Sequence, residues 1–145
     1  MRALVQRVSE ASVSVDNNIV GSIKKGFVVL LGLTHNDTKK EADFVVDKVA
    51  NLRVFKDEND KMNLSLKDVN GELLVISQFT LYGDCQKGRR PSFVEAARPE
   101  HAIPLYKYIV SELKKTGIKV ETGIFGASME VDIHNSGPVT LMIEK

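Results

Sequence analysis

The fold of this chain is decided by one continuous apolar stretch, FVVLLGL at residues 27–33. A run without a polar face is typical of a strand that is covered on both sides. Shortly after it, Thr38 and Glu41 have the spacing of a capping box, in which each side chain accepts a hydrogen bond from a free backbone N–H. Apolar residues then recur at helical spacing: Ala42, Val45, Val46, Val49 and Leu52. A buried strand followed by an amphipathic helix predicts a mixed α/β fold.

The remaining elements follow from the same periodicities. Residues 11–15 alternate with period two, a polar turn follows, and residues 19–23 complete a predicted hairpin. A second helix is expected to begin at Pro99 and to stop at Gly117, with a kink or delay at Pro104. Further strands are predicted at residues 62–66, 72–82, 119–124, 129–134 and 139–143. We therefore expect one domain over residues 1–145, with about eight strands in a barrel-like sheet and two helices packed on it.

Composition, net charge and cysteine content limit the classes of protein to which this chain can belong. The chain has 145 residues and is 43% apolar and 27% charged, as an ordinary globular protein is. Its formal net charge is +1, so a contact with a polyanion must come from a local patch. Cys85 is the only cysteine, which excludes an internal disulfide and a cysteine metal cluster and suits a reducing cytoplasm. No apolar segment approaches the ~20 residues that span a bilayer. We expect a cytoplasmic protein without a membrane segment.

Polar residues interrupt the predicted strand at residues 72–82. Ser77, Gln78 and Thr80 stand where the apolar pattern should continue. They are either edge-strand residues bonded to backbone or a cluster that, with the N–H groups of Phe79 and Thr80, holds a polarised carbonyl or its oxyanion. The residues alone leave both interpretations open.

Other catalytic arrangements have little support. There is no Gly-x-Ser-x-Gly elbow of a serine hydrolase. His35, His101 and His134 lie in a loop, a helix and a strand without ligand spacing, so no metal site is predicted. Among them only His134 is a candidate acid–base group.

Two further strings have both a structural and a functional interpretation. Lys87, Arg89 and Arg90 flank Gly88 in the densest basic run, which is either a solvated loop or a loop that contacts phosphates. Gly137-Pro138 on its own predicts a turn.

Taken together, these strings resemble the D-aminoacyl-tRNA deacylase family from end to end. The resemblance is carried, in order, by RALVQRV (2–8), Gly21, VLLG (29–32), SQFTL (77–81), GRRPSF (88–93), FGA-x-M (125–129) and N-x-GPVT (135–140).

The resemblance implies a homodimer, with its active site at the subunit interface, that hydrolyses D-aminoacyl-tRNA and glycyl-tRNA without a metal or cofactor. It implies that Gly137-Pro138 has a cis peptide and enters the partner's pocket, where it confers chiral selectivity. The substrate's ribose 2′-hydroxyl is expected to assist the reaction. The remaining implied site residues are Ser77, Gln78, Phe79 and Thr80 for catalysis, Phe125, Ala127, Met129 and Asn135 for the pocket, and Lys87, Arg89 and Arg90 for tRNA.

There is a physical reason why the expected chiral selectivity should rely on a rigid obstruction, which we call the filter. Apolar fit alone discriminates by only ~10–200-fold, so rejection of abundant L-aminoacyl-tRNA requires an obstruction that cannot move aside. Glycine, without a side chain, passes such a filter. Two alternatives remain at this stage: a non-catalytic RNA-binding accessory of translation, and a small-molecule esterase or thioesterase.

Overall fold

The structure, a computed structural model of residues 1–145, is organised around the long strand β1 (Arg2–Val15). Its first half pairs antiparallel with β3 (Gly26–Gly32) and its second half with β2 (Asn18–Ile23). Strand β8 (Glu130–Glu144) runs antiparallel along the other edge of β1. Strand β1 is therefore hydrogen-bonded to three strands, and the predicted hairpin of residues 11–23 is confirmed.

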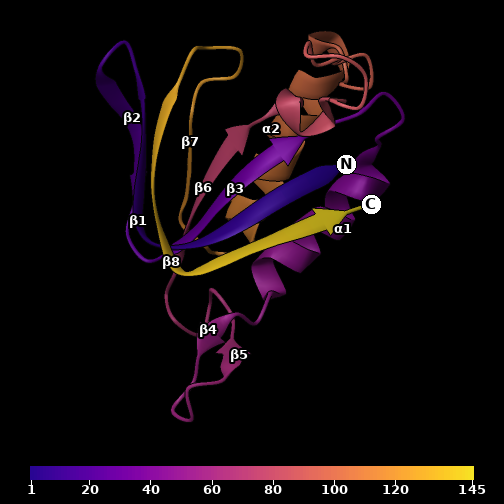
Figure 1. The fold of residues 1–145 in the computed structure, drawn as a ribbon. Coiled ribbons are helices and arrows are strands. Elements are labelled where there is room, and N and C mark those ends of the chain that lie inside the picture. Colours follow the sequence, from indigo (N-terminus) through magenta and orange to yellow (C-terminus); the bar gives the residue numbers. More distant parts are fainter.

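The sheet curls until its ends nearly meet. Strand β3 pairs in parallel with β6 (Glu72–Ser77), and β6 pairs in parallel with β7 (Val120–Thr122). Gly21 of β2 lies so close to β7 that a Cβ added there would be 2.7 Å from the backbone oxygen of Thr122. This contact brings the two outer strands together and confirms the barrel-like sheet (Figure 1).

Two helices cover one face of the sheet (Figure 1). Helix α1 (Lys39–Asn51) begins with the predicted capping box, in which the N–H of Lys40 donates to Thr38 Oγ1 and the N–H of Thr38 donates to Glu41. Helix α2 (Pro99–Lys115) begins at the expected proline and continues past Pro104, so the predicted delay does not occur. Neither helix has the length and apolarity to cross a membrane.

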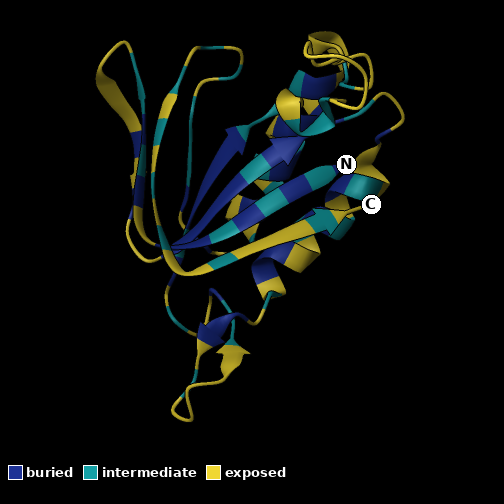
Figure 2. Ribbon diagram, in the orientation of Figure 1, coloured by how far each residue is buried: buried dark blue, intermediate teal, exposed yellow.

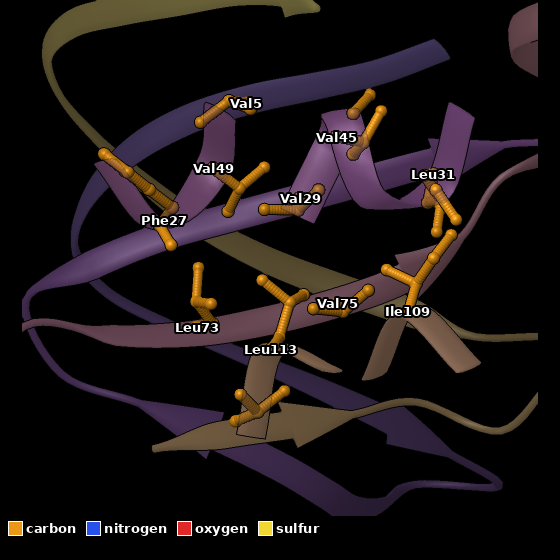
Figure 3. Packing of buried hydrophobic residues seen from close by; sticks show 14 of the residues in the cluster. Val5, Phe27, Val29, Leu31, Val45, Val49, Leu73, Val75, Ile109 and Leu113 are labelled. Carbon is orange, nitrogen blue, oxygen red and sulfur yellow. The ribbon is translucent and has the colours of Figure 1, made fainter. Parts of the chain in front are cut away.

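The hydrophobic core has two parts, one on each face of the sheet. The larger cluster lies between the sheet and the helices; Figure 3 shows valine and leucine side chains of β3 and β6 packed against Val45 and Val49 of α1 and against Ile109 and Leu113 of α2. The smaller cluster fills the barrel: Val8, Ala11, Val13, Ile23, Val28, Leu74 and Ile76. Strands β3 and β6 are covered on both faces, as the apolar run predicts (Figure 2).

Three short elements complete the chain. Strands β4 (Phe55–Lys56) and β5 (Met62–Leu64) form a hairpin that projects from the end of the molecule opposite the basic loop (Figure 1). Strand β5 is shorter than the strand predicted at residues 62–66, and β7 is shorter than the one predicted at 119–124. A single turn of 3₁₀ helix, η1 (Phe79–Tyr82), follows β6.

The prediction of one strand over residues 72–82 was wrong. Strand β6 ends at Ser77, which pairs with Leu31 near the end of β3. The N–H of Gln78 still donates to the Leu31 carbonyl at 2.8 Å, but beyond Gly32 no neighbouring strand remains to pair with. The chain therefore turns into η1, so Thr80 lies in a helical turn.

The prediction of two separate strands near the C-terminus was also wrong. Residues 129–134 and 139–143 belong to the single strand β8, because both halves pair with β1. The turn expected at Gly137-Pro138 is instead a bulge within this strand.

One buried tyrosine makes the stability of the fold sensitive to alkaline pH. Tyr106 of α2 donates a hydrogen bond to the Val75 carbonyl at 2.8 Å, and burial raises the pKa of Tyr106 to about 12. Since the ordinary pKa of tyrosine is about 10, its contribution is complete below that pH and is lost as pH rises through the folded-state value.

We expect Tyr106→Phe to lower the free energy of unfolding by about 1 kcal/mol at neutral pH, because one hydrogen bond is lost. The variant should also lose less stability than the wild type between pH 8 and 11.5. Urea unfolding at both pH values measures this difference. An equal alkaline loss in the two proteins would assign that loss to other groups.

Candidate functional site

A cavity of about 550 Å³ opens where β3 and β6 end. The carboxyl ends of parallel strands are where open α/β sheets place their functional groups. Ser77, Gln78 and Phe79 line one wall. Phe125, Ala127 and Met129, from the segment between β7 and β8, line another. The cavity thus brings together six residues that the sequence predicts for the site, from two segments far apart along the chain.

Thr80 lies next to this cavity but does not line it. It is exposed in η1, and the Gln78 side-chain amide donates a hydrogen bond to its hydroxyl. The first residues of a helical turn have N–H groups without an intrahelical acceptor. The start of η1 therefore offers the backbone N–H groups of Phe79 and Thr80 beside the cavity.

Aromatic and small residues set the shape of the cavity. Phe79 packs edge-on against Phe93, with ring centroids 5.2 Å apart. Phe125 packs edge-on against Tyr106, with ring centroids 5.6 Å apart. A Cβ on Gly123 would collide with the Met129 sulfur. Packing against neighbouring side chains therefore fixes the positions of the apolar residues that line the cavity.

The segment before α2 supplies a wall that the sequence reasoning missed. Phe93, Ala96, Ala97, Arg98 and Pro99 line the cavity. Two hydrogen bonds hold this segment against the end of β3: the backbone N–H of Ala97 donates to the Leu33 carbonyl at 2.9 Å, and the Thr34 side-chain hydroxyl donates to the Glu95 carbonyl at 2.6 Å. The only signal in the sequence that could have indicated this wall is the apolar cluster that directly follows the basic, glycine-containing loop.

The three histidines lie outside the cavity. A ring nitrogen of His35 hydrogen-bonds the Val94 carbonyl at 2.6 Å, and one of His101 hydrogen-bonds the Asp37 carbonyl at 2.8 Å. His134, the acid–base candidate, lies on β8 between Glu10 and Asp132, at 3.3 and 3.5 Å. Among the lining residues only Arg98 carries a charge. The cavity therefore offers hydrogen-bonding groups without a protein acid–base pair.

The bulge in β8 is large. Gln6 pairs with Thr140 and Val8 pairs with Asn135, so Arg7 alone faces residues 136–139. Within this bulge the Gly137-Pro138 peptide is cis, and both residues are exposed.

Two side chains fix the bulge at its base. Asn135 accepts a hydrogen bond from the N–H of Val139 at 3.1 Å and donates one to the Thr140 hydroxyl at 2.9 Å. Arg7 Nε donates to the Ser136 carbonyl at 3.1 Å, and Arg7 Nη1 donates to the Val54 carbonyl at 2.6 Å. Asn135 therefore shapes the bulge and does not line the cavity of its own chain.

Position 137 accepts only glycine without rearrangement. Its φ is +126°, a conformation that residues with a side chain rarely adopt. A Cβ there would also lie 2.8 Å from Arg7 Nη2. Neither Gly137 nor Pro138 lines the 550 Å³ cavity, so within one chain the bulge and the cavity are separate.

The predicted tRNA-contacting residues lie on an exposed loop. Asp84 and Ser92 exchange two backbone hydrogen bonds, of 2.8 and 2.9 Å, which close the base of this loop. Lys87, Arg89 and Arg90 are exposed between them and form no ion pair within the chain. The loop continues directly into Phe93, so the cations stand beside the cavity wall.

Comparison with known proteins identifies the family. A model of the D-Tyr-tRNA(Tyr) deacylase family matches residues 4–144. A D-aminoacyl-tRNA deacylase of Clostridium perfringens (strain SM101 / Type A) is 62% identical over 144 residues, which cover 99% of this chain and 97% of that protein. One of Clostridioides difficile (strain 630) is 58% identical, with the same two coverages of 99% and 97%.

A solved structure is similar over the whole chain. It is described as c-Myc DNA Unwinding Element Binding Protein, is 42% identical and has a TM-score of 0.93. The match covers 100% of this chain and 99% of that one. From the matches in sequence and in structure, we conclude that this chain belongs to the D-Tyr-tRNA(Tyr) deacylase family and is a hydrolase.

Proposed function

We propose that this protein hydrolyses, in the cytoplasm, the ester that joins a D-amino acid or glycine to the 3′-terminal ribose of tRNA, and that it leaves L-aminoacyl-tRNA intact. The observation that carries this proposal is the single cavity in which Ser77, Gln78 and Phe79 meet Phe125 and Met129. Its size suits an amino acid and the adjoining ribose, and the basic loop beside it suits the tRNA backbone.

The chemistry follows from what lines the cavity. Water attacks the ester carbonyl, the new carbon–oxygen bond forms, and the bond to the ribose oxygen breaks. We expect the N–H groups at the start of η1 and the Ser77 hydroxyl to stabilise the oxyanion that develops. No histidine or carboxylate lines the cavity, so the proton reaches the departing oxygen through water or through the ribose 2′-hydroxyl.

The selective element belongs to a second copy of the chain. Gly137 and Pro138 are exposed and separate from the cavity of their own chain, so they are available to enter that of a partner. Leu141 and Met142 follow on the same strand and are 40% and 47% exposed on its two faces, and a homodimer formed along this edge of the sheet would cover both. In this arrangement the bulge fills the space that an L side chain would need.

The first experiment is hydrolysis of matched tRNA esters. We expect labelled D-tyrosyl-tRNA and glycyl-tRNA to be deacylated, and L-tyrosyl-tRNA to react more than about 10³-fold more slowly than the D form. That ratio exceeds the ~10–200-fold that apolar fit provides. Release of the labelled amino acid measures all three rates.

The outcomes of this assay separate the alternatives. Binding of tRNA without deacylation would indicate an RNA-binding accessory. Hydrolysis of small esters with no dependence on salt would indicate a small-molecule esterase, because tRNA affinity must fall as salt rises. Inertness toward glycyl-tRNA would contradict the proposed filter.

The filter predicts a role for Asn135. We expect Asn135→Ala to loosen the bulge and to increase hydrolysis of L-tyrosyl-tRNA about tenfold or more, since two hydrogen bonds at its base are lost. D-tyrosyl-tRNA should still react. Asn135→Asp keeps the acceptor for the Val139 N–H and should restore most of the discrimination. The D/L ratio of kcat/KM for the three proteins tests this, and an unchanged ratio in Asn135→Ala would remove Asn135 from the filter.

The basic loop predicts a change in substrate binding. Replacing Arg89 and Arg90 by alanine should raise the KM for D-tyrosyl-tRNA roughly tenfold or more and lower kcat little, because the loop lies outside the cavity. Lys107→Ala with Lys114→Ala removes the same charge from exposed positions of α2 and serves as the control. A loss confined to kcat would place the arginines in the chemical step.

A further inference from the structure

A second cleft, of about 690 Å³, lies beside the bulge of β8. Gly137 and Pro138 form one side of it, Phe55 and Met62 of the β4–β5 hairpin form the other, and Arg7 of β1 contributes from between them. We call it the bulge cleft. Neither the proposed chemistry nor the proposed filter uses it.

The bulge cleft carries an excess of positive charge. Arg7, Lys25 and Lys56 line it, against one carboxylate, that of Asp60. Lys56 is paired with Asp60 at 2.7 Å, whereas Arg7 and Lys25 form no ion pair. The whole chain has a formal net charge of only +1, so two unpaired cations in one cleft are a local feature.

Arg7 is the more unusual of the two cations, because it is only 8% exposed. Its Nε and Nη1 donate to the carbonyls of Ser136 and Val54, which are neutral acceptors and leave the charge uncompensated. Nη2 has no acceptor in the chain. Since no fully buried side-chain nitrogen lacks a partner, Nη2 retains access to solvent at the cleft. A mostly buried guanidinium with a spare donor is a strong site for an anion.

The walls of the cleft also offer apolar surface. Met62 is 57% exposed at the rim, whereas Phe55 is only 2% exposed; the Phe55 ring stacks on Phe27 and lies 5.5 Å from Lys25 Nζ. Cations beside exposed apolar surface suit a nucleic-acid strand, which combines an anionic backbone with partly apolar sugars and bases.

We propose that the bulge cleft binds the phosphate attached to the 5′ carbon of the terminal ribose of tRNA, with Arg7 and Lys25 as its donors. This inference rests on the proposed function, in which Gly137 and Pro138 meet the aminoacyl group in the partner's cavity. The terminal ribose joins that group to the phosphate, so a site for the phosphate must border the bulge, as this cleft does. Each substrate would then be held by the cavity of one subunit and the bulge cleft of the other.

The test compares two small substrates, 3′-O-D-tyrosyl-adenosine and the same ester with a 5′-phosphate. For the wild type we expect the phosphate to lower KM about tenfold, as a charge-assisted contact does. Lys25→Ala should abolish most of that gain, leave kcat unchanged and leave the phosphate-free ester unaffected.

Lys24→Ala is the matched control. Lys24 is the neighbouring residue in the same turn, but it lines a different cleft, together with Glu72 and Lys119. It should behave like the wild type with both esters. If Lys25→Ala matched Lys24→Ala, or weakened both esters equally, the phosphate site would be refuted.

A binding measurement separates failure of this inference from failure of the proposed function. An RNA oligonucleotide ending in CCA, titrated against the ¹⁵N-labelled protein, should shift the amide resonances of Gly137 and Lys25, and Lys25→Ala should weaken binding about tenfold. Shifts at these residues without ester hydrolysis would retain the site and reject the deacylase activity. Hydrolysis without these shifts would support the deacylase activity and reject the phosphate site. A Lys25→Ala variant that weakens the dimer in sedimentation, with substrate KM unchanged, would assign the cleft to the partner protein instead.

Discussion

The bulge of β8 and the bulge cleft both depend on how one arginine is accommodated between two strands. Arg7 stands opposite four residues of β8, and its guanidinium bonds hold the bulge on one side and the start of the β4–β5 hairpin on the other. The missing side chain of Gly137 leaves the room that this guanidinium occupies. The two hydrogen bonds from Arg7 fix the carbonyls of Ser136 and Val54, and they reduce the cost of burying the guanidinium without neutralising its charge. The projection of the bulge and the width of the bulge cleft both follow from this contact.

The cavity and the bulge are built on different parts of the chain. The cavity stands on the ends of β3 and β6 and has hydrogen-bonding groups, aromatic walls and a single charge, that of Arg98. The bulge stands on the opposite edge of β1 and presents mostly backbone. Because the two have separate supports, substitutions should be able to alter the proposed contribution of the cavity to rate and that of the bulge to selectivity independently.

Local periodicity was sufficient for much of the fold. The apolar run at residues 27–33, the capping box at Thr38 and the proline at the start of α2 each specify their element through neighbouring residues, and each prediction is confirmed. The errors at β6 and at β8 have a common cause. The end of β6 at Ser77 is set by the end of β3, and the continuity of β8 is set by the length of β1. A partner strand far away in sequence decides both, and local pattern does not contain that information. The cavity wall at Phe93 was missed for the same reason, since hydrogen bonds to the Leu33 carbonyl and from the Thr34 hydroxyl place this segment.

The pairing of β1 with β8 has a consequence for how the chain folds during its synthesis. Arg2 lies opposite Glu144, so β1, which is synthesised before the other strands described here, is completed only by β8, which is synthesised after them. Until then one edge of β1 has unsatisfied N–H and C=O groups, and contacts of such long sequence separation form slowly. The bulge belongs to that last strand. A nascent chain can therefore assemble its helices and the floor of its cavity well before it acquires the segment proposed to tell one hand of an amino acid from the other.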